Sequence, residues 1–109
     1  MADNDFQLKL LQMDLDIVKR ELEIHKNNVE LFKIRLDLDS IHHEDYEDYI
    51  KGLIDERDET KETRNNFIHI SNLFYNKNTY LLKNEELSDE IKQLKEKKKE
   101  LIRWQTMKD

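Results

Sequence analysis

The residues with the clearest potential for chemistry are two groups of carboxylates that resemble each other. In each group two acidic residues, one other residue and two further acidic residues follow in order, and the second group begins eleven residues after the first. Eleven residues are close to three helical turns, so on one helix both groups would share a face, about 16 Å apart. The carboxylates are Glu44, Asp45, Glu47, Asp48, Asp55, Glu56, Asp58 and Glu59.

Like charges stacked on one helix face lower the stability of the helix, so their presence calls for an explanation, and two are considered. One is an ordinary solvated face. The other is contact with a basic partner, including imitation of a phosphate backbone by an inhibitor that blocks a nucleic-acid-binding enzyme through residues 44–62. Calcium binding has less support, because an EF-hand loop needs glycine at a fixed position.

Metal, cofactor and catalytic sites are not expected. His42 and His43 are adjacent, so on a helix their side chains point about 100° apart, whereas a helical metal site needs ligands four residues apart. The chain has no cysteine, and its single glycine excludes a glycine-rich phosphate loop. No Ser/His/Asp arrangement stands out either. We therefore predict a protein that is not an enzyme.

A basic stretch at residues 92–103 could follow nucleic-acid phosphates. Acidic residues interrupt it, which is typical of i, i+4 pairing on a coiled-coil surface, and no aromatic residues alternate with it as stacking platforms. A nucleic-acid adaptor is one alternative function, but nucleic acid is not the partner we expect.

The elements that carry these residues are predicted to be long helices. Charged residues make up 40% of the chain and hydrophobic residues 37%, with no proline, a composition typical of coiled coils. We predict an all-α antiparallel bundle or coiled coil, forming a single elongated domain over residues 1–109. Its three helices would cover residues 4–39, 41–76 and 79–107, and the segment 40–76 would be the acidic one.

The first helix is predicted from apolar residues that recur at alternating steps of three and four. These residues are Leu8, Leu11, Leu15, Val18, Leu22, His25, Val29, Phe32 and Leu36. This is the a/d pattern of a coiled-coil seam, apolar everywhere except at His25. An unbroken helix of about 35 residues would be roughly 50 Å long, and it needs other helices to cover its seam.

Two further patterns lie in the same segment. Leu10, Ile17, Ile24, Leu31 and Leu38 form a second row with a seven-residue period. The wide apolar arc that results can contact two neighbours, which favours a bundle of three or more helices from one chain or several. Residues 32–39 alternate as a strand would, but the seven-residue repeat across the whole segment favours a helix.

Helix ends are predicted from polar residues. Asp39 and Ser40 are expected to end the first helix and to cap the second. Residues 55–66 contain no apolar side chain, which fits a solvated helix or a loop, and we favour the helix. Asparagine and threonine at 76–79, together with a shift in the apolar phase, predict a turn there.

The last helix would have a thin second seam formed by Leu87, Ile91, Leu94 and Leu101. Because this seam offers little burial, self-association is expected, with a dimer favoured. In a parallel dimer two His25 imidazoles would meet and burial would disfavour their charged form, so stability is expected to fall below about pH 6. A core histidine with a hydrogen-bond partner is the simpler alternative.

The predicted function is a non-enzymatic protein–protein interaction or assembly module that acts through coiled-coil oligomerisation. The expected partners are a second copy of the chain or another protein with a basic or apolar helical surface. No apolar run exceeds three residues, so no segment of the chain is expected to span a membrane, and a membrane is not an expected partner. The acidic, polar first residues are unlike a signal peptide, so a cytoplasmic location is expected.

Overall fold

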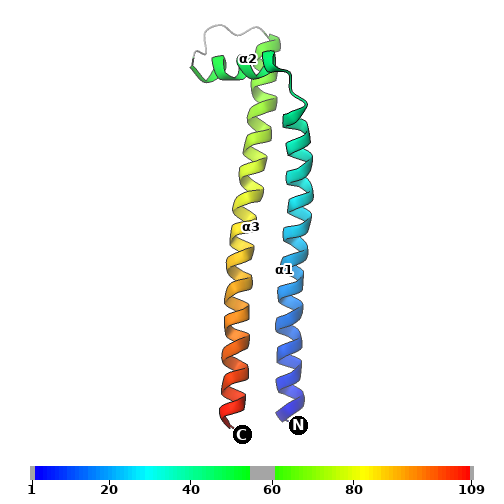
Figure 1. The fold of residues 1–109 in the computed structure, drawn as a ribbon, viewed down its shortest axis with the longest axis vertical. Helices are drawn as coiled ribbons and strands as arrows, with labels where there is room; N and C mark the ends of the chain where they lie inside the picture. Colours follow the sequence, from blue (N-terminus) through cyan, green and yellow to red (C-terminus); the bar gives the residue numbers. More distant parts are fainter. Residues whose placement is uncertain (1, 55–60, 109) are drawn as a thin grey trace. The chain divides into compact units, whose positions relative to one another are not determined.

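The computed structural model describes residues 2–54 and 61–108, and every regular element in this part of the chain is an α-helix (Figure 1). Helix α1 spans Ala2–Asp39, α2 spans His43–Ile54 and α3 spans Lys61–Lys108. The prediction of an all-α protein with three helices is confirmed, but α2 ends before the predicted residue 76 and α3 begins before the predicted residue 79.

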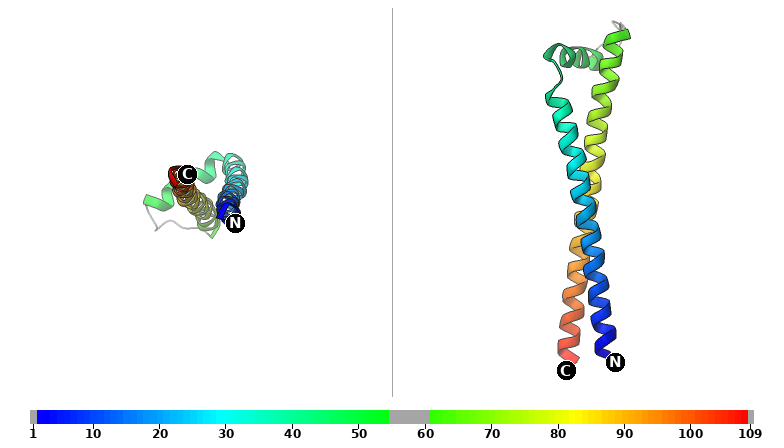
Figure 2. Two further views of the ribbon diagram at one scale, coloured as in Figure 1. Left: turned by 90° about the horizontal axis from the view of Figure 1, so that it is seen from below. Right: turned by 90° about the vertical axis from the view of Figure 1, so that its right-hand side faces the viewer.

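The chain divides into two compact units, of which unit 1 contains residues 1–27 and 82–109 and unit 2 contains residues 28–81. In each unit α1 and α3 lie side by side (Figures 1 and 2). In unit 2 the short helix α2 lies across α3 (Figure 1). The single domain expected over the whole chain stays a prediction.

The end of α1 differs in detail from the predicted cap. The helix contains all of residues 32–39, so the strand-like alternation there does not produce a strand. The amide of Ser40 donates to the carbonyl of Leu36 at 3.1 Å, and its hydroxyl donates to the carbonyl of Asp37 at 2.8 Å. Ser40 therefore closes α1 and does not cap the next helix.

Helix α2 begins at His43, two residues later than the predicted start at residue 41. Glu44 and Asp45 lie in its first turn, where carboxylates interact favourably with the helix dipole. Of the segment 55–66, which we predicted to be a solvated helix, residues 61–66 belong to α3. Residues 55–60 lie outside the described part of the chain.

The turn predicted at residues 76–79 is wrong, because α3 runs through this segment without a break. The hydroxyl of Thr79 donates to the carbonyl of Tyr75 at 2.9 Å, a bond that forms within a helix. Ile70 and Leu73 are buried, and seven residues after Leu73 the half-buried Tyr80 lies at the same position of the helical repeat. The seam of α3 therefore keeps its phase. The phase shift seen in the sequence arises because Phe67 and Phe74 belong to a neighbouring row of the same helix.

That neighbouring row packs against α2 in unit 2. The ring of Tyr49 lies 5.4 Å from that of Phe67 and 5.7 Å from that of Phe74, measured between centroids. Gly52 allows α2 to approach closely, since a Cβ at this position would lie 2.7 Å from Cδ2 of Phe67. The amide of Asn66 adds a 3.0 Å hydrogen bond to the carboxylate of Asp45. Aromatic packing thus holds α2 against α3, and the absence of a side chain at Gly52 allows the close contact.

Candidate interaction surface

The contact between α1 and α3 in unit 1 uses one row of α1, here called the inner row. Its buried and half-buried members recur at steps of three and four, as in a coiled coil. They are Leu10, Met13, Ile17, Arg20, Ile24 and Asn27. Two of the six are polar, which makes this seam less apolar than a typical coiled-coil core.

Polar contacts across the seam set the register of the two helices. Arg20 Nε lies 2.8 Å from Glu90 Oε2, and Lys98 pairs with Asp14. Asn27 Nδ2 donates to Asn84 Oδ1 at 2.9 Å. As the residue numbers of these contacts increase along α1, the numbers of their partners decrease along α3, so the two helices are antiparallel.

Asn27 is 4% exposed, and its hydrogen bond to the half-buried Asn84 is partly shielded from water. A buried asparagine at such a position fixes register at some cost in stability. Replacing it alone, as Asn27→Leu, removes the donor to Asn84, and we expect a loss of about 1–3 kcal/mol in unfolding free energy. Urea unfolding followed by circular dichroism measures this loss.

The double variant Asn27→Leu/Asn84→Leu is the control for this pair. It removes both polar groups of the pair together, so the double variant should recover part of the stability lost in the single one. A double variant whose loss equals or exceeds that of Asn27→Leu would show that the pair does not act as a unit.

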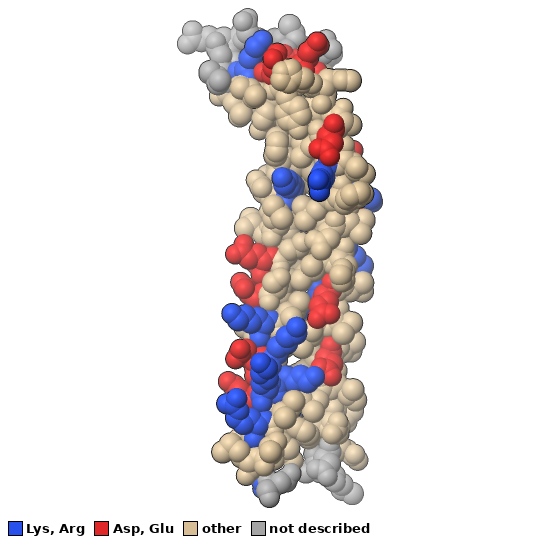
Figure 3. Space-filling view, viewed as in Figure 1, with Lys and Arg blue, Asp and Glu red and all other residues tan. Residues whose placement is uncertain are grey.

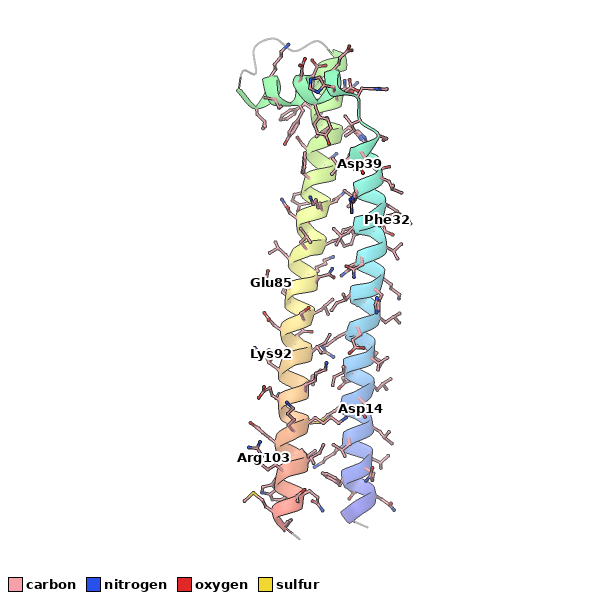
Figure 4. The ribbon with its side chains drawn as sticks, in the orientation of Figure 1. Asp14, Phe32, Asp39, Glu85, Lys92 and Arg103 are labelled. Carbon is pink, nitrogen blue, oxygen red and sulfur yellow. The ribbon has the colours of Figure 1, made fainter. Side chains whose placement is uncertain are left out.

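A second row of α1, here called the outer stripe, carries the residues that the sequence predicted as the first seam. In unit 1 the structure exposes Leu8, Leu11, Leu15, Val18, Leu22 and His25. In unit 2 the spacing continues with Val29, Phe32 and Leu36 (Phe32 is labelled in Figure 4). The eight apolar members are between 47% and 62% exposed.

The outer stripe and the inner row lie on opposite sides of α1. Residues two positions apart on an α-helix are separated by about 200° around its axis. Leu15 and Ile17 therefore point in nearly opposite directions, and so do Leu22 and Ile24. The burial follows this geometry, with Ile17 at 7% exposed and Leu15 at 47%.

This placement corrects part of the predicted seam. Leu8, Leu11, Leu15, Val18, Leu22, His25, Val29, Phe32 and Leu36 do not form the core within the chain. The inner row takes that place, because its polar members find partners on α3 while its apolar members are covered. As a seam between copies of the chain, the outer stripe stays a prediction.

The second predicted seam lies on the side of α3 that faces α1 in unit 1. Ile91 is buried, and Leu87, Leu94 and Leu101 are half-buried. Sequence reasoning missed Arg20 and Asn27 as seam residues. Only their positions in the sequence could have identified them, because they continue the steps of three and four that contain Met13 and Ile17.

The first acidic group is partly engaged within the chain. Asp45 accepts the hydrogen bond from Asn66, and Glu47 Oε1 lies 3.2 Å from Nε2 of His43. Glu44 is exposed and Asp48 is half-buried. The second group, Asp55, Glu56, Asp58 and Glu59, lies outside the described residues, so the shared acidic face stays a prediction.

The lysine and arginine side chains of the basic stretch at residues 92–103 are exposed except for Lys98, which is half-buried and pairs with Asp14. Figure 3 shows basic side chains gathered on one face there, with acidic side chains beside them. Lys92 and Arg103 both extend from α3 (Figure 4). The mixture of charges fits a solvated coiled-coil surface at least as well as a track for phosphates.

Unit 2 also contains an open groove of about 700 Å³. Its walls are largely apolar, with Phe32, Tyr46 and Phe74 among them, and its charged residues are Arg35, Asp39 and Lys77. The groove lining contains no nucleophile paired with a base, so we assign no chemistry to it.

Within residues 2–54 and 61–108, no group of three histidine, cysteine or acidic side chains is placed to hold a metal ion. In the same residues, no helix combines the length and apolarity that crossing a bilayer requires. Comparison of the chain with protein-family models, with curated proteins and with solved structures found no match.

Proposed function

We propose that the protein is a non-enzymatic assembly module that associates through the outer stripe of α1 by coiled-coil packing. The observation that supports this proposal is the stripe itself. Eight large apolar side chains at coiled-coil spacing are about half exposed, and those in unit 1 lie on the side of α1 opposite the inner row. Contiguous apolar surface of this kind marks interaction sites on soluble proteins.

The free energy available from the outer stripe is of the same order as the cost of association. Covering one half-exposed aliphatic side chain contributes about 1 kcal/mol. Because both copies in a dimer contribute their stripes, the sum is comparable to the roughly 4–15 kcal/mol that the loss of translational and rotational freedom costs on association. Association would also stabilise the contact between the inner row and α3. The inner row includes polar residues and buries little apolar surface, and a second copy packed on the outer stripe would stiffen α1.

The two alternative functions have less support. An acidic inhibitor would need free carboxylates, but Asp45 and Glu47 already interact with Asn66 and His43. A nucleic-acid adaptor would use the basic stretch, where Lys98 is engaged by Asp14.

Thermal unfolding over a hundredfold range of protein concentration tests the proposed association. If the folded form is an oligomer, mass action raises the melting temperature with concentration, here by at least about 5 °C. A melting temperature that stays constant over this range would contradict the proposal.

A further inference from the structure

We propose that the outer stripe in unit 1 is covered by the same stripe of a second copy, with the two α1 helices parallel and in register. This inference rests on the proposed function, and it adds the identity and the direction of the partner helix. It follows from charged residues on either side of the stripe.

Two rows of opposite charge flank the outer stripe in unit 1. On one side the acidic residues Asp14 and Glu21 directly precede Leu15 and Leu22. On the other side Lys19 and Lys26 directly follow Val18 and His25. These are the g and e positions of a coiled coil, whose charges set the orientation of the helices.

In a parallel pair, a g residue meets the e residue five positions later on the other helix. Glu21 would then face Lys26 of the second copy, and Asp14 would face Lys19. Two-fold symmetry repeats each contact. In an antiparallel pair, e residues meet e residues and g residues meet g residues, so lysine would face lysine and carboxylate would face carboxylate. The charges therefore favour the parallel arrangement.

Glu21, Lys19 and Lys26 are exposed and can make these contacts. Asp14 would share its carboxylate with Lys98, so the pair of Glu21 and Lys26 expresses the preference most directly. In unit 2 the acidic row is not continued, because Asn28 and Arg35 occupy its positions. The inference is therefore confined to unit 1.

A second α1 also matches the stripe better than α3 does. The exposed large apolar side chains of α3 in unit 1 are Leu82, Ile102, Trp104 and Met107. Trp104 and Met107 share a face, but no exposed large apolar side chain lies between Leu82 and Ile102, so these four residues cannot form a continuous seam. The stripe of α1 has the required spacing.

Single cysteines test the direction, since the natural chain has none. The variants are Leu11→Cys and His25→Cys, whose positions lie about 21 Å apart along the helix. Each variant is treated separately with a short bis-maleimide. In a parallel, in-register dimer both positions face their own copies, so more than half of each variant should crosslink to itself. Leu82→Cys, on α3, is the matched control and should remain largely uncrosslinked.

Each other outcome has a distinct meaning. In an antiparallel pair only a position on the two-fold axis faces its own copy, so two separated positions cannot both crosslink. Crosslinking of one variant or neither, in a protein that still has the mass of a dimer, would overturn the inference and leave the proposed function intact. Equal crosslinking of Leu82→Cys would overturn it as well. A monomeric protein would overturn both proposals.

Discussion

Replacing Leu15 and Leu22 with aspartate is expected to raise the dissociation constant of the dimer about a thousandfold or more, because the interface would then bury unpaired carboxylates. Both leucines are about half exposed in the single chain, so the aspartates can be solvated in the monomer. Helix content should therefore persist while the molar mass falls. Sedimentation velocity measures the mass, and circular dichroism measures the helix content.

Leu82→Asp is the matched control for this variant, because it makes the same change at a leucine on α3 that is 61% exposed. It should leave the dimer intact, since Leu82 lies outside the outer stripe. If Leu15→Asp/Leu22→Asp remains a dimer, or if Leu82→Asp dissociates equally, the stripe is not the interface.

Replacing Ile70 with alanine is expected to cost about 2–5 kcal/mol of unfolding free energy, through lost burial and the cavity left behind. Ile70 is 1% exposed in unit 2, the lowest value among the buried apolar residues there. Urea unfolding at a fixed protein concentration measures the effect, because concentration itself shifts the stability of an oligomer.

Ile68→Ala provides the comparison within the same helix. Ile68 is 48% exposed, so the same substitution should cost about 1 kcal/mol or less. The change in helix propensity is common to both variants and cancels in the comparison. Equal losses for the two variants would show that Ile70 is not part of the core.

The helical fold could be predicted because local and long-range patterns agree over most of the chain. Residues 32–39 show how the conflict is resolved where they differ. Their alternation fits a strand, but a strand there would need a neighbouring strand. The chain lacks the turn residues that would form a hairpin and supply that strand. The heptad spacing requires only a second helix, and α1 includes the whole segment.

The choice between the two rows of α1 could not be made from apolarity. The outer stripe is the more apolar row, yet the inner row packs against α3. Asn27 and Arg20 look unsuited to a seam until their partners on α3, Asn84 and Glu90, are known. A single sequence shows the positions of such residues but not which of them meet.

The break predicted at residues 76–79 failed for a related reason. Asparagine and threonine oppose helix formation locally, but tertiary packing outweighs a few tenths of a kcal/mol per residue. Ile70 and Leu73 pack in unit 2 and Leu87 packs in unit 1, and all three keep the same phase along α3. A turn would place them on different faces, so the packing stabilises the uninterrupted helix.

The absolute molar mass in solution, measured by light scattering on a sizing column, tests the central claim most directly. The chain has a mass of 13.4 kDa, and association through the outer stripe predicts twice that value for the natural protein. The same measurement on Leu15→Asp/Leu22→Asp should give the mass of one chain. A natural protein that elutes with a mass of 13.4 kDa at every concentration would contradict the account.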